Sequence, residues 1–128
     1  MHSQGSVASY MRFCMRRVIP KQIENVLTLT AYAVDETGEW VGFAAIDYAD
    51  TVHPSIEIKI APEKRGRGYG YELVKAVVDA AFERYLFAYL EYDVVKFNEA
   101  SRRIVQKLGG VLMYADDDGE SYRLKPKR

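Results

Sequence analysis

The stretch that decides the fold is Ser55–Arg84, which reads SIEIKIAPEKRGRGYGYELVKAVVDAAFER. In Ser55–Ile60, isoleucines alternate with polar residues, and this pattern predicts a strand with one buried face. Pro62 ends the strand, because proline has no N–H group to donate to a ladder. From Tyr71 onward the apolar residues recur at helical spacing, which predicts an amphipathic helix. The stretch therefore predicts a strand, a turn and a helix in that order.

The turn between the strand and the helix, Arg65–Gly70, is rich in glycine and arginine. Glycines permit positive φ and let the backbone approach a ligand closely. The unpaired N–H groups at a helix start favour an anion, and Lys64, Arg65 and Arg67 add positive charge there. The turn is therefore a candidate phosphate or pyrophosphate site. The alternative interpretation is a glycine-rich loop with a solvated basic rim.

The spacing of this turn excludes two common phosphate-binding motifs. It reads G-x-G-x-G, whereas the dinucleotide fingerprint is G-x-G-x-x-G, and the chain contains no Gly-Lys pair for the other phosphate loop. Arg65–Gly70 instead matches R/Q-x-x-G-x-G/A between a strand and a helix. A second motif follows, in which Asn98–Ser101 reads N-x-x-S and precedes a helix that ends in Lys107–Gly110.

With these two motifs in this order, the sequence resembles the GNAT superfamily of acetyl-CoA-dependent N-acetyltransferases. The resemblance covers roughly Leu27–Leu124 and implies a mixed α/β sheet of the acyl-CoA N-acyltransferase fold. Such proteins normally have two helices before the first hairpin, whereas only residues 7–26 precede it here, so we expect an abbreviated N-terminus. Those helices commonly help to form the acceptor pocket. We therefore expect an open pocket or one that a second subunit completes, and we favour a homodimer.

Elsewhere in the chain, alternation predicts a strand at Leu27–Val34, with Trp40–Tyr48 as its partner strand, and a run rich in Tyr, Leu, Phe and Val predicts a strand at Tyr85–Val95. Val111–Ala115 and Ser121–Leu124 flank Asp116–Gly119, which predicts a hairpin. Helical spacing predicts a second helix at Glu99–Leu108. The strand after the first helix is expected to run parallel to the central strand, as in a crossover unit. We expect one helix on each side of the sheet. Tyr10–Ile19 is compatible with a strand or a short helix. Pro20 is expected to break it, and Lys21–Asn25 to form a helical turn or a connection.

Composition predicts one domain over residues 1–128, with residues 1–6 disordered. Eighteen basic and eighteen acidic residues cancel, so no overall charge favours nucleic acid. No apolar run approaches the ~20 residues of a membrane span, and no secretory signal is visible. The single Cys14 excludes an internal disulfide and fits a cytoplasmic protein. Two histidines and one cysteine without ligand spacing give no support for a metal site.

The resemblance implies that acetyl-CoA lies between the central strand and the Tyr85–Val95 strand, where the two separate. The cofactor-binding residues that it implies are the backbone of Ile58, Lys59 and Ile60 for the pantetheine arm, Arg65, Gly66, Arg67, Gly68, Tyr69 and Gly70 for the pyrophosphate, Asn98 for the pantetheine, and Ser101 beside it. Asn98 is also a preferred helix-capping residue, and both roles can coexist.

The implied reaction is direct attack of a primary amine on the thioester, without a covalent enzyme intermediate. Glu57 and Asp93 are the candidate bases, and a plain surface carboxylate is an equally good interpretation of either. His53 is a third candidate. A bulge in the central strand would change the face that Glu57 occupies. Val105 stands where many relatives have the tyrosine that protonates the thiolate, and the sequence does not choose a substitute among Tyr92, Tyr114 and Tyr122.

The acceptor stays open between a small amine, a polyamine, an amino acid, an antibiotic and a peptide or protein N-terminus. A non-catalytic acyl-CoA-binding module would keep Arg65–Gly70 and Asn98 but lack a working base or acid. A protein-interaction module on the same fold would need no cofactor at all, because fold does not fix function.

Overall fold

A computed structural model describes residues 18–23, 26–47, 54–84 and 87–127. The interpretations that concern residues 1–6, Cys14, His53 and most of Tyr10–Ile19 lie outside these residues.

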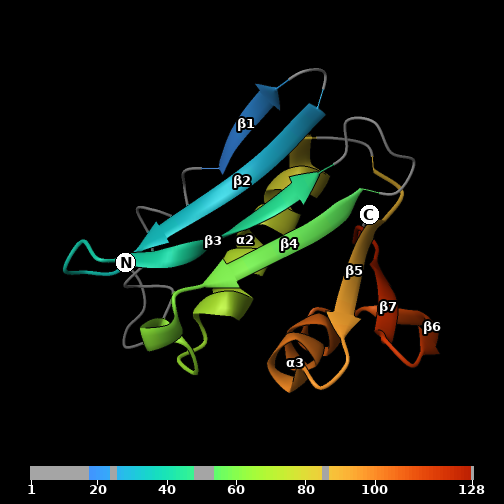
Figure 1. Ribbon diagram of the computed structural model, residues 1–128. Coiled ribbons are helices and arrows are strands. Elements are labelled where there is room, and N and C mark those ends of the chain that lie inside the picture. Colours follow the sequence, from blue (N-terminus) through green and yellow to red (C-terminus); the bar gives the residue numbers. More distant parts are fainter. Residues whose placement is uncertain (1–17, 24–25, 48–53, 85–86, 128) are drawn as a thin grey trace.

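One mixed sheet organises the described residues, with the strand order β1-β2-β3-β4-β5-β7-β6 (Figure 1). Its strands are β1 (Val18–Ile23), β2 (Val26–Val34), β3 (Trp40–Asp47), β4 (Ser55–Ile60), β5 (Leu90–Val95), β6 (Val111–Asp116) and β7 (Gly119–Leu124). The helices are the 3₁₀ turn η1 (Pro62–Lys64), α2 (Tyr69–Arg84) and α3 (Glu99–Lys107). Among the described strands, only β4 and β5 pair in parallel, as expected of two strands joined by a crossover helix. The predicted mixed α/β fold is confirmed.

The prediction for the segment before β2 is wrong. Pro20 is predicted to break the preceding element, and Lys21–Asn25 to form a helical turn or a connection. Instead, β1 runs through Pro20 to Ile23 and pairs antiparallel with β2, with Pro20 opposite Leu29. β1 lies at the edge of the sheet, where a residue without an N–H group can be accommodated. Local sequence therefore misleads at this strand, because its position at the edge decides the outcome.

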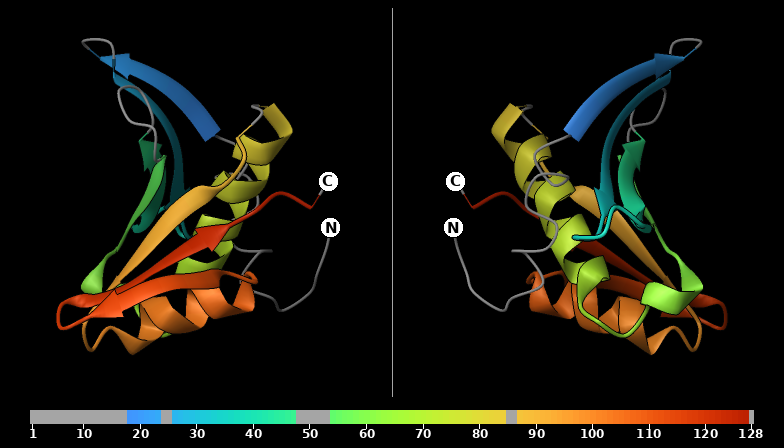
Figure 2. Two further views of the ribbon diagram at one scale, coloured as in Figure 1. Left: turned by 90° about the vertical axis from the view of Figure 1, so that its right-hand side faces the viewer. Right: turned by 90° about the vertical axis from the view of Figure 1, so that its left-hand side faces the viewer.

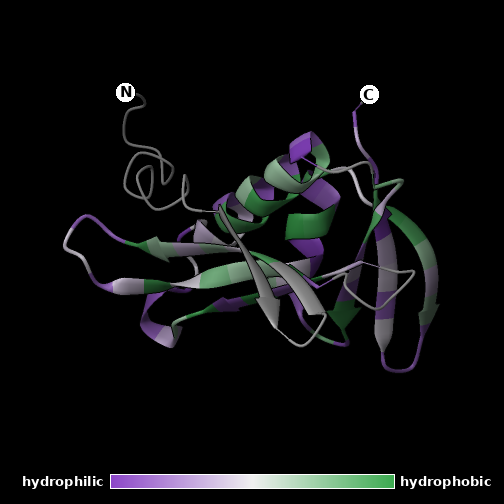
Figure 3. Cartoon of the chain, turned by 90° about the horizontal axis from the view of Figure 1, so that it is seen from above, coloured by the Kyte–Doolittle hydropathy of each residue, from purple (hydrophilic) through white to green (hydrophobic). Residues whose placement is uncertain are grey.

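Both helices lie on one face of the sheet, so the expectation of one helix on each side is also wrong (Figure 2). Ile56, Ile58 and Ile60 of β4 pack toward the same core as the buried apolar side of α2. A side chain at Gly70 of α2 would touch both Ile58 and Ile104 of α3, so the two helices meet over the same side of β4. Figure 3 shows polar and apolar residues alternating along α2, which packs on β2–β4.

The remaining elements follow the predictions closely. β4 has the predicted bounds, whereas β5 begins only at Leu90 within the expected run. The β6–β7 hairpin is confirmed, and the Asp116 carboxylate accepts hydrogen bonds from the N–H groups of Asp118 and Gly119 at 2.8 and 3.2 Å. This acidic turn is therefore held by its own first residue, in the manner of an Asx turn.

Candidate active site

The central feature of the site is the divergence of β4 and β5. Among the described residues the two strands pair only at Ser55 and Glu91, where the Glu91 N–H group donates to the carbonyl oxygen of Pro54 at 2.7 Å. Beyond this point the strands separate toward their C-terminal ends (Figure 1). The ladder of the sheet is therefore interrupted along one edge of β4.

The backbone groups that face this interruption can be identified by alternation. Because the carbonyl of Pro54 points toward β5, those of Ile58 and Ile60 point the same way. The carbonyl oxygen of Lys59 points toward β3, since a Cβ built on Gly42 would lie 2.1 Å from it. Of the three residues named from the sequence, Ile58 and Ile60 therefore present backbone groups to the interruption, and Lys59 does not.

The glycine-rich turn lies at the end of this strand and at the start of α2. Gly66 and Gly68 have φ values of +76° and +84°, a region that side chains with a Cβ rarely adopt. The Glu72 N–H group donates to the Gly68 carbonyl at 3.3 Å, so α2 begins immediately after Gly68. The N–H groups of the first helical turn have no partners within the helix and point out of this end. The turn thus presents a positive helix end at an exposed loop.

The two residues at the beginning of α2 differ in what they can contact. The side chain of Tyr69 is buried in the core, so only its backbone is available to a ligand. A Cβ on Gly70 would lie 3.0 Å from Ile104 Cδ1 and 3.4 Å from Ile58 Cδ1. Gly70 therefore allows α2 to approach β4 and α3 closely, which is a packing role.

The sequence predicts that Lys64, Arg65 and Arg67 all add positive charge to the turn. In the structure only Arg65 and Arg67 present their charge there. Both arginines are exposed, and Arg65 Nε donates to the carbonyl oxygen of Ile60 at 3.1 Å. Lys64 is only 6% exposed, and its Nζ lies 2.6 Å from Asp35 Oδ2 and 2.6 Å from Glu39 Oε1. Its charge is therefore neutralised inside the protein.

Lys64 is the last residue of η1, just before the glycine-rich turn, and it links η1 to the β2–β3 hairpin. Asp35 Oδ1 accepts hydrogen bonds from the Thr37 N–H, the Thr37 hydroxyl and the Glu39 N–H, at 2.9, 2.6 and 3.0 Å. The hydrogen bond from Lys64 holds the pKa of the Asp35 carboxyl well below its usual range, and that bond raises the pKa of Lys64. No local sequence pattern indicates this pair, because its members are 29 residues apart.

Asn98 and Ser101 lie at the start of α3, on the other side of the interruption. Asn98 is the N-cap residue, and its Oδ1 accepts a hydrogen bond from the Ser101 N–H at 3.1 Å, which leaves its amide NH₂ to donate elsewhere. The buried Ser101 hydroxyl lies 3.0 Å from the Tyr92 hydroxyl. Sequence reasoning missed Phe97 just before the cap, which is 82% exposed at a φ of +72°.

The tyrosines considered as substitutes at the Val105 position have different environments. Burial raises the pKa of Tyr92, whose hydroxyl contacts Ser101. The Tyr122 hydroxyl donates to Glu120 Oε1 at 2.8 Å, an oxygen that also accepts from Arg102 Nε at 2.8 Å. Tyr114 is exposed on β6, separated from β5 by β7. Of the three, Tyr92 lies on a strand that borders the interruption.

Glu57 and Asp93 lie on the two strands that flank the interruption, and both side chains are exposed. Glu57 alternates with the inward-facing Ile56 and Ile58, and Asp93 with the buried Tyr92 and Val94, so both carboxylates lie on the face opposite the helices. β4 pairs with β3 without a register shift, so the considered bulge in the central strand does not occur. The interruption therefore has helix termini on one side and two carboxylates on the other.

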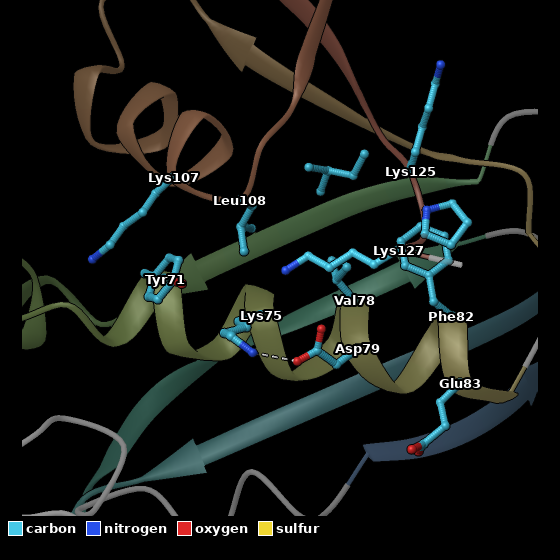
Figure 4. Close-up of a pocket in the computed structure, with 12 residues that line it drawn as sticks. Tyr71, Lys75, Val78, Asp79, Phe82, Glu83, Lys107, Leu108, Lys125 and Lys127 are labelled. Carbon is cyan, nitrogen blue, oxygen red and sulfur yellow. Dashed lines mark hydrogen bonds and ion pairs between the residues drawn. The ribbon is translucent and has the colours of Figure 1, made fainter.

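A separate hollow of about 310 Å³ lies along the outer side of α2, between the end of α3 and the C-terminal segment (Figure 4). Its lining includes the exposed ion pair of Lys75 and Asp79, whose Nζ and Oδ2 atoms are 2.7 Å apart, and Lys107, whose ammonium lies 4.3 Å from the centre of the Tyr71 ring. The glycine-rich turn does not line this hollow.

The sequence and the structure of this chain can be compared with those of known proteins. A mixed sheet with two diverging parallel strands and a glycine-rich turn at a helix start defines a class of domain that can bind an extended, phosphate-bearing ligand. The sequence model of the acetyltransferase (GNAT) domain matches residues 3–111. The chain belongs to the GNAT acetyltransferase family. No curated protein sequence matches it.

Solved structures agree on the fold. An acetyltransferase from Agrobacterium tumefaciens str. C58 is 25% identical with a TM-score of 0.63, and the match covers 79% of this chain and 60% of that one. The N-acetyltransferase PseH of Campylobacter jejuni is 17% identical with a TM-score of 0.64, over 82% and 71%. Mutant forms of the spermidine/spermine N-acetyltransferase SpeG of Vibrio cholerae are 15% identical with a TM-score of 0.61, over 79% and 63%. The chain thus spans 60–71% of the length of these structures.

None of the helices in the described segments has the length and apolar character needed to cross a membrane. No group of three or more His, Cys, Asp and Glu side chains in these segments is arranged to hold a metal ion.

Proposed function

We propose that this chain is an acetyl-CoA-dependent N-acetyltransferase that acetylates a primary amine by direct attack. The observation that carries the proposal is the position of the Gly66–Gly70 turn, at the end of the unpaired edge of β4 and at the start of α2. A ligand with an extended arm and an attached pyrophosphate needs an unpaired strand edge for the arm, and next to it a helix start for the pyrophosphate. The residues therefore fit acetyl-CoA, which supplies an activated acetyl thioester.

The unpaired edge of β4 and the start of α2 divide the binding of this cosubstrate between them. The backbone groups of Ile58 and Ile60 bind the pantetheine arm as they would bind a neighbouring strand. The N–H groups of the turn and of the first turn of α2 bind the pyrophosphate, with Arg67 adding charge. Asn98 donates its free NH₂ to the pantetheine while its oxygen caps α3.

The two faces of the sheet then serve the two substrates. The turn and the start of α3 belong to the helix side, whereas Glu57 and Asp93 lie on the opposite face. An amine that approaches from the face with the carboxylates meets the thioester within the interruption. Glu57 is adjacent in sequence to Ile58, whose backbone borders the interruption, so we propose Glu57 as the general base and Asp93 as the second carboxylate at the acceptor site.

This arrangement does not require a tyrosine at position 105. A thiolate is a fair leaving group and can take a proton from water. The hydroxyl of Tyr92 also lies on a strand that borders the interruption, where it contacts the Ser101 hydroxyl. The backbone N–H groups along β4 polarise the thioester carbonyl, and positioning supplies much of the remaining acceleration. The absence of the family tyrosine is the observation behind a second candidate function, a non-catalytic acyl-CoA-binding module.

Calorimetric titration of acetyl-CoA and of CoA into the purified protein tests the cosubstrate. We expect micromolar binding of both, with thiol release when an amine is added. The amine panel should include polyamines, since a spermidine/spermine acetyltransferase is among the fold relatives, together with amino acids and peptide N-termini. Binding without thiol release for any amine would support the non-catalytic module, and a folded sample that binds neither ligand would contradict both.

Replacing Lys64 by methionine is expected to weaken CoA binding without removing any contact to the ligand. The substitution deletes both ion pairs that tie η1 to the β2–β3 hairpin, so the turn that follows loses its anchor. Because small misplacements of a binding group are costly, we expect about a tenfold rise in Kd. Lys75→Met is the matched control, since it deletes an exposed ion pair on α2 that does not involve η1 or the β2–β3 hairpin.

Calorimetry and circular dichroism would be run on both variants. Equal CoA affinities for Lys64→Met and Lys75→Met, in folded proteins, would show that Lys64 does not position the turn. A Lys64→Arg variant that recovers most of the affinity would support the positioning role, because it restores a cation at the same place.

A further inference from the structure

The face of the sheet opposite the helices, here called the open face, carries a row of side chains beside the proposed base Glu57. Strand register places Phe43 of β3 opposite Lys59 of β4, and Tyr32 of β2 opposite Phe43 (Figure 1). Residues directly opposite each other in antiparallel strands lie on one face, and the rings of Tyr32 and Phe43 agree with this, since their centroids are 6.5 Å apart. Because Glu57 and Lys59 both alternate with inward-facing isoleucines, all four side chains share the open face.

Lys59 brings a positive charge close to the Glu57 carboxylate. The two residues are two positions apart on β4, which corresponds to roughly 7 Å along a strand. The Lys59 side chain is exposed, and no described residue forms an ion pair with it. The open face of β4 therefore presents a carboxylate and, closer to the C-terminal end of the strand, an ammonium group that is available to a ligand.

The side chains next to Glu57 and Lys59 differ in size. The residue opposite Glu57 on β3 is the short Ala45, which leaves the carboxylate accessible from the side of β3. Beside Lys59 the aromatic rings of Phe43 and Tyr32 continue the row, and Tyr32 is 42% exposed. A ligand whose amine reaches Glu57 therefore meets an aromatic surface on the same side as the ammonium of Lys59.

The charges around Glu57 favour an anionic group over a second cation in the ligand. A second ammonium, as in a polyamine, would meet the Lys59 cation at one end of the row. Toward the other end, Asp47 and Glu91 also lie on the open face, but each of them already interacts with another residue. An anionic group near Lys59 instead gains a charge-assisted hydrogen bond.

We propose that the acceptor is a small amine that also carries a carboxylate and an apolar group, of which an apolar amino acid is the simplest example. Its amine lies at Glu57, and its carboxylate accepts a hydrogen bond from the Lys59 ammonium. Its apolar group packs against Phe43 and Tyr32. The opposite charges along β4 orient such a zwitterion, so that its amine faces the thioester in the interruption. This inference rests on the proposed function, because it names the acceptor of that same site.

Calorimetric titration of two matched amines into the CoA-saturated protein tests the inference. L-phenylalanine and phenethylamine differ only in the carboxylate, and we expect L-phenylalanine to bind about tenfold more tightly, which is the contribution of one hydrogen bond between charged groups. Lys59→Met should remove this difference, whereas Lys59→Arg should retain most of it. Lys75→Met is the control, since Lys75 is an exposed lysine on α2, which covers the opposite face of the sheet.

The inference would be overturned if L-phenylalanine did not bind, if it bound no more tightly than phenethylamine or spermidine, or if Lys59→Met left its advantage unchanged. Thiol release from acetyl-CoA, measured with the same amines, separates this inference from the proposed function. Binding of L-phenylalanine that depends on Lys59 but gives no thiol release would support the acceptor site and contradict catalysis. Thiol release with phenethylamine or spermidine alone would support catalysis and contradict the acceptor class.

Discussion

Gly68→Val is expected to abolish CoA binding while the protein stays folded. Gly68 has a φ of +84° and immediately precedes α2. A β-branched residue held in such a conformation costs roughly 1–3 kcal/mol, so the turn would relax to another conformation. The N–H groups of the turn and of the helix start would then no longer point at one anion. We expect a loss of at least about a hundredfold in affinity, because several charge-assisted hydrogen bonds are lost together.

Gly109→Val is the matched control for this experiment. Gly109 has a φ of +82° and follows α3, and a Cβ there would meet no atom within 4 Å. The two variants therefore impose the same backbone strain in exposed turns, but only one turn belongs to the candidate site. Calorimetry should show normal CoA affinity for Gly109→Val. Unchanged affinity in a folded Gly68→Val variant would contradict the assignment of the turn.

Glu57→Gln is expected to lower kcat by roughly 10²–10⁴, the usual contribution of a general base. The side chain lies on the face opposite the helices, so its replacement should leave the Kd for CoA unchanged. Asp93→Asn is the matched variant on the other strand, and we expect it mainly to raise KM for the amine. The measurement is the rate of thiol release, at saturating acetyl-CoA, with the best amine of the panel.

The pair of variants separates the alternatives for the base. If Asp93→Asn loses kcat and Glu57→Gln does not, the roles of the two carboxylates are exchanged. If both variants keep the wild-type kcat, neither carboxylate removes the proton, and the amine loses it to solvent. Both results would leave the cosubstrate assignment intact, because that assignment depends on the turn and on the edge of β4.

The sequence alone predicted the elements that depend on nearby residues. The strand at Ser55–Ile60, the glycine-rich turn and the helix after it follow from alternation, positive-φ residues and helical spacing, all within 30 residues. The same holds for the N-cap at Asn98 and the β6–β7 hairpin. These features form wherever the segment is placed, so a pattern of neighbours is sufficient to find them.

The tertiary structure decided what depends on residues far apart in the chain. The sequence predicts Lys64 to be part of the basic turn, but Asp35 and Glu39 approach it only once the β2–β3 hairpin has packed beside η1. Pro20 is accommodated because β1 is an edge strand, and the faces on which the two helices and Glu57 lie follow from packing against one core. The reason is physical: burial and ion pairing are set by which segments meet, and periodicity within a segment contains no information about its partner.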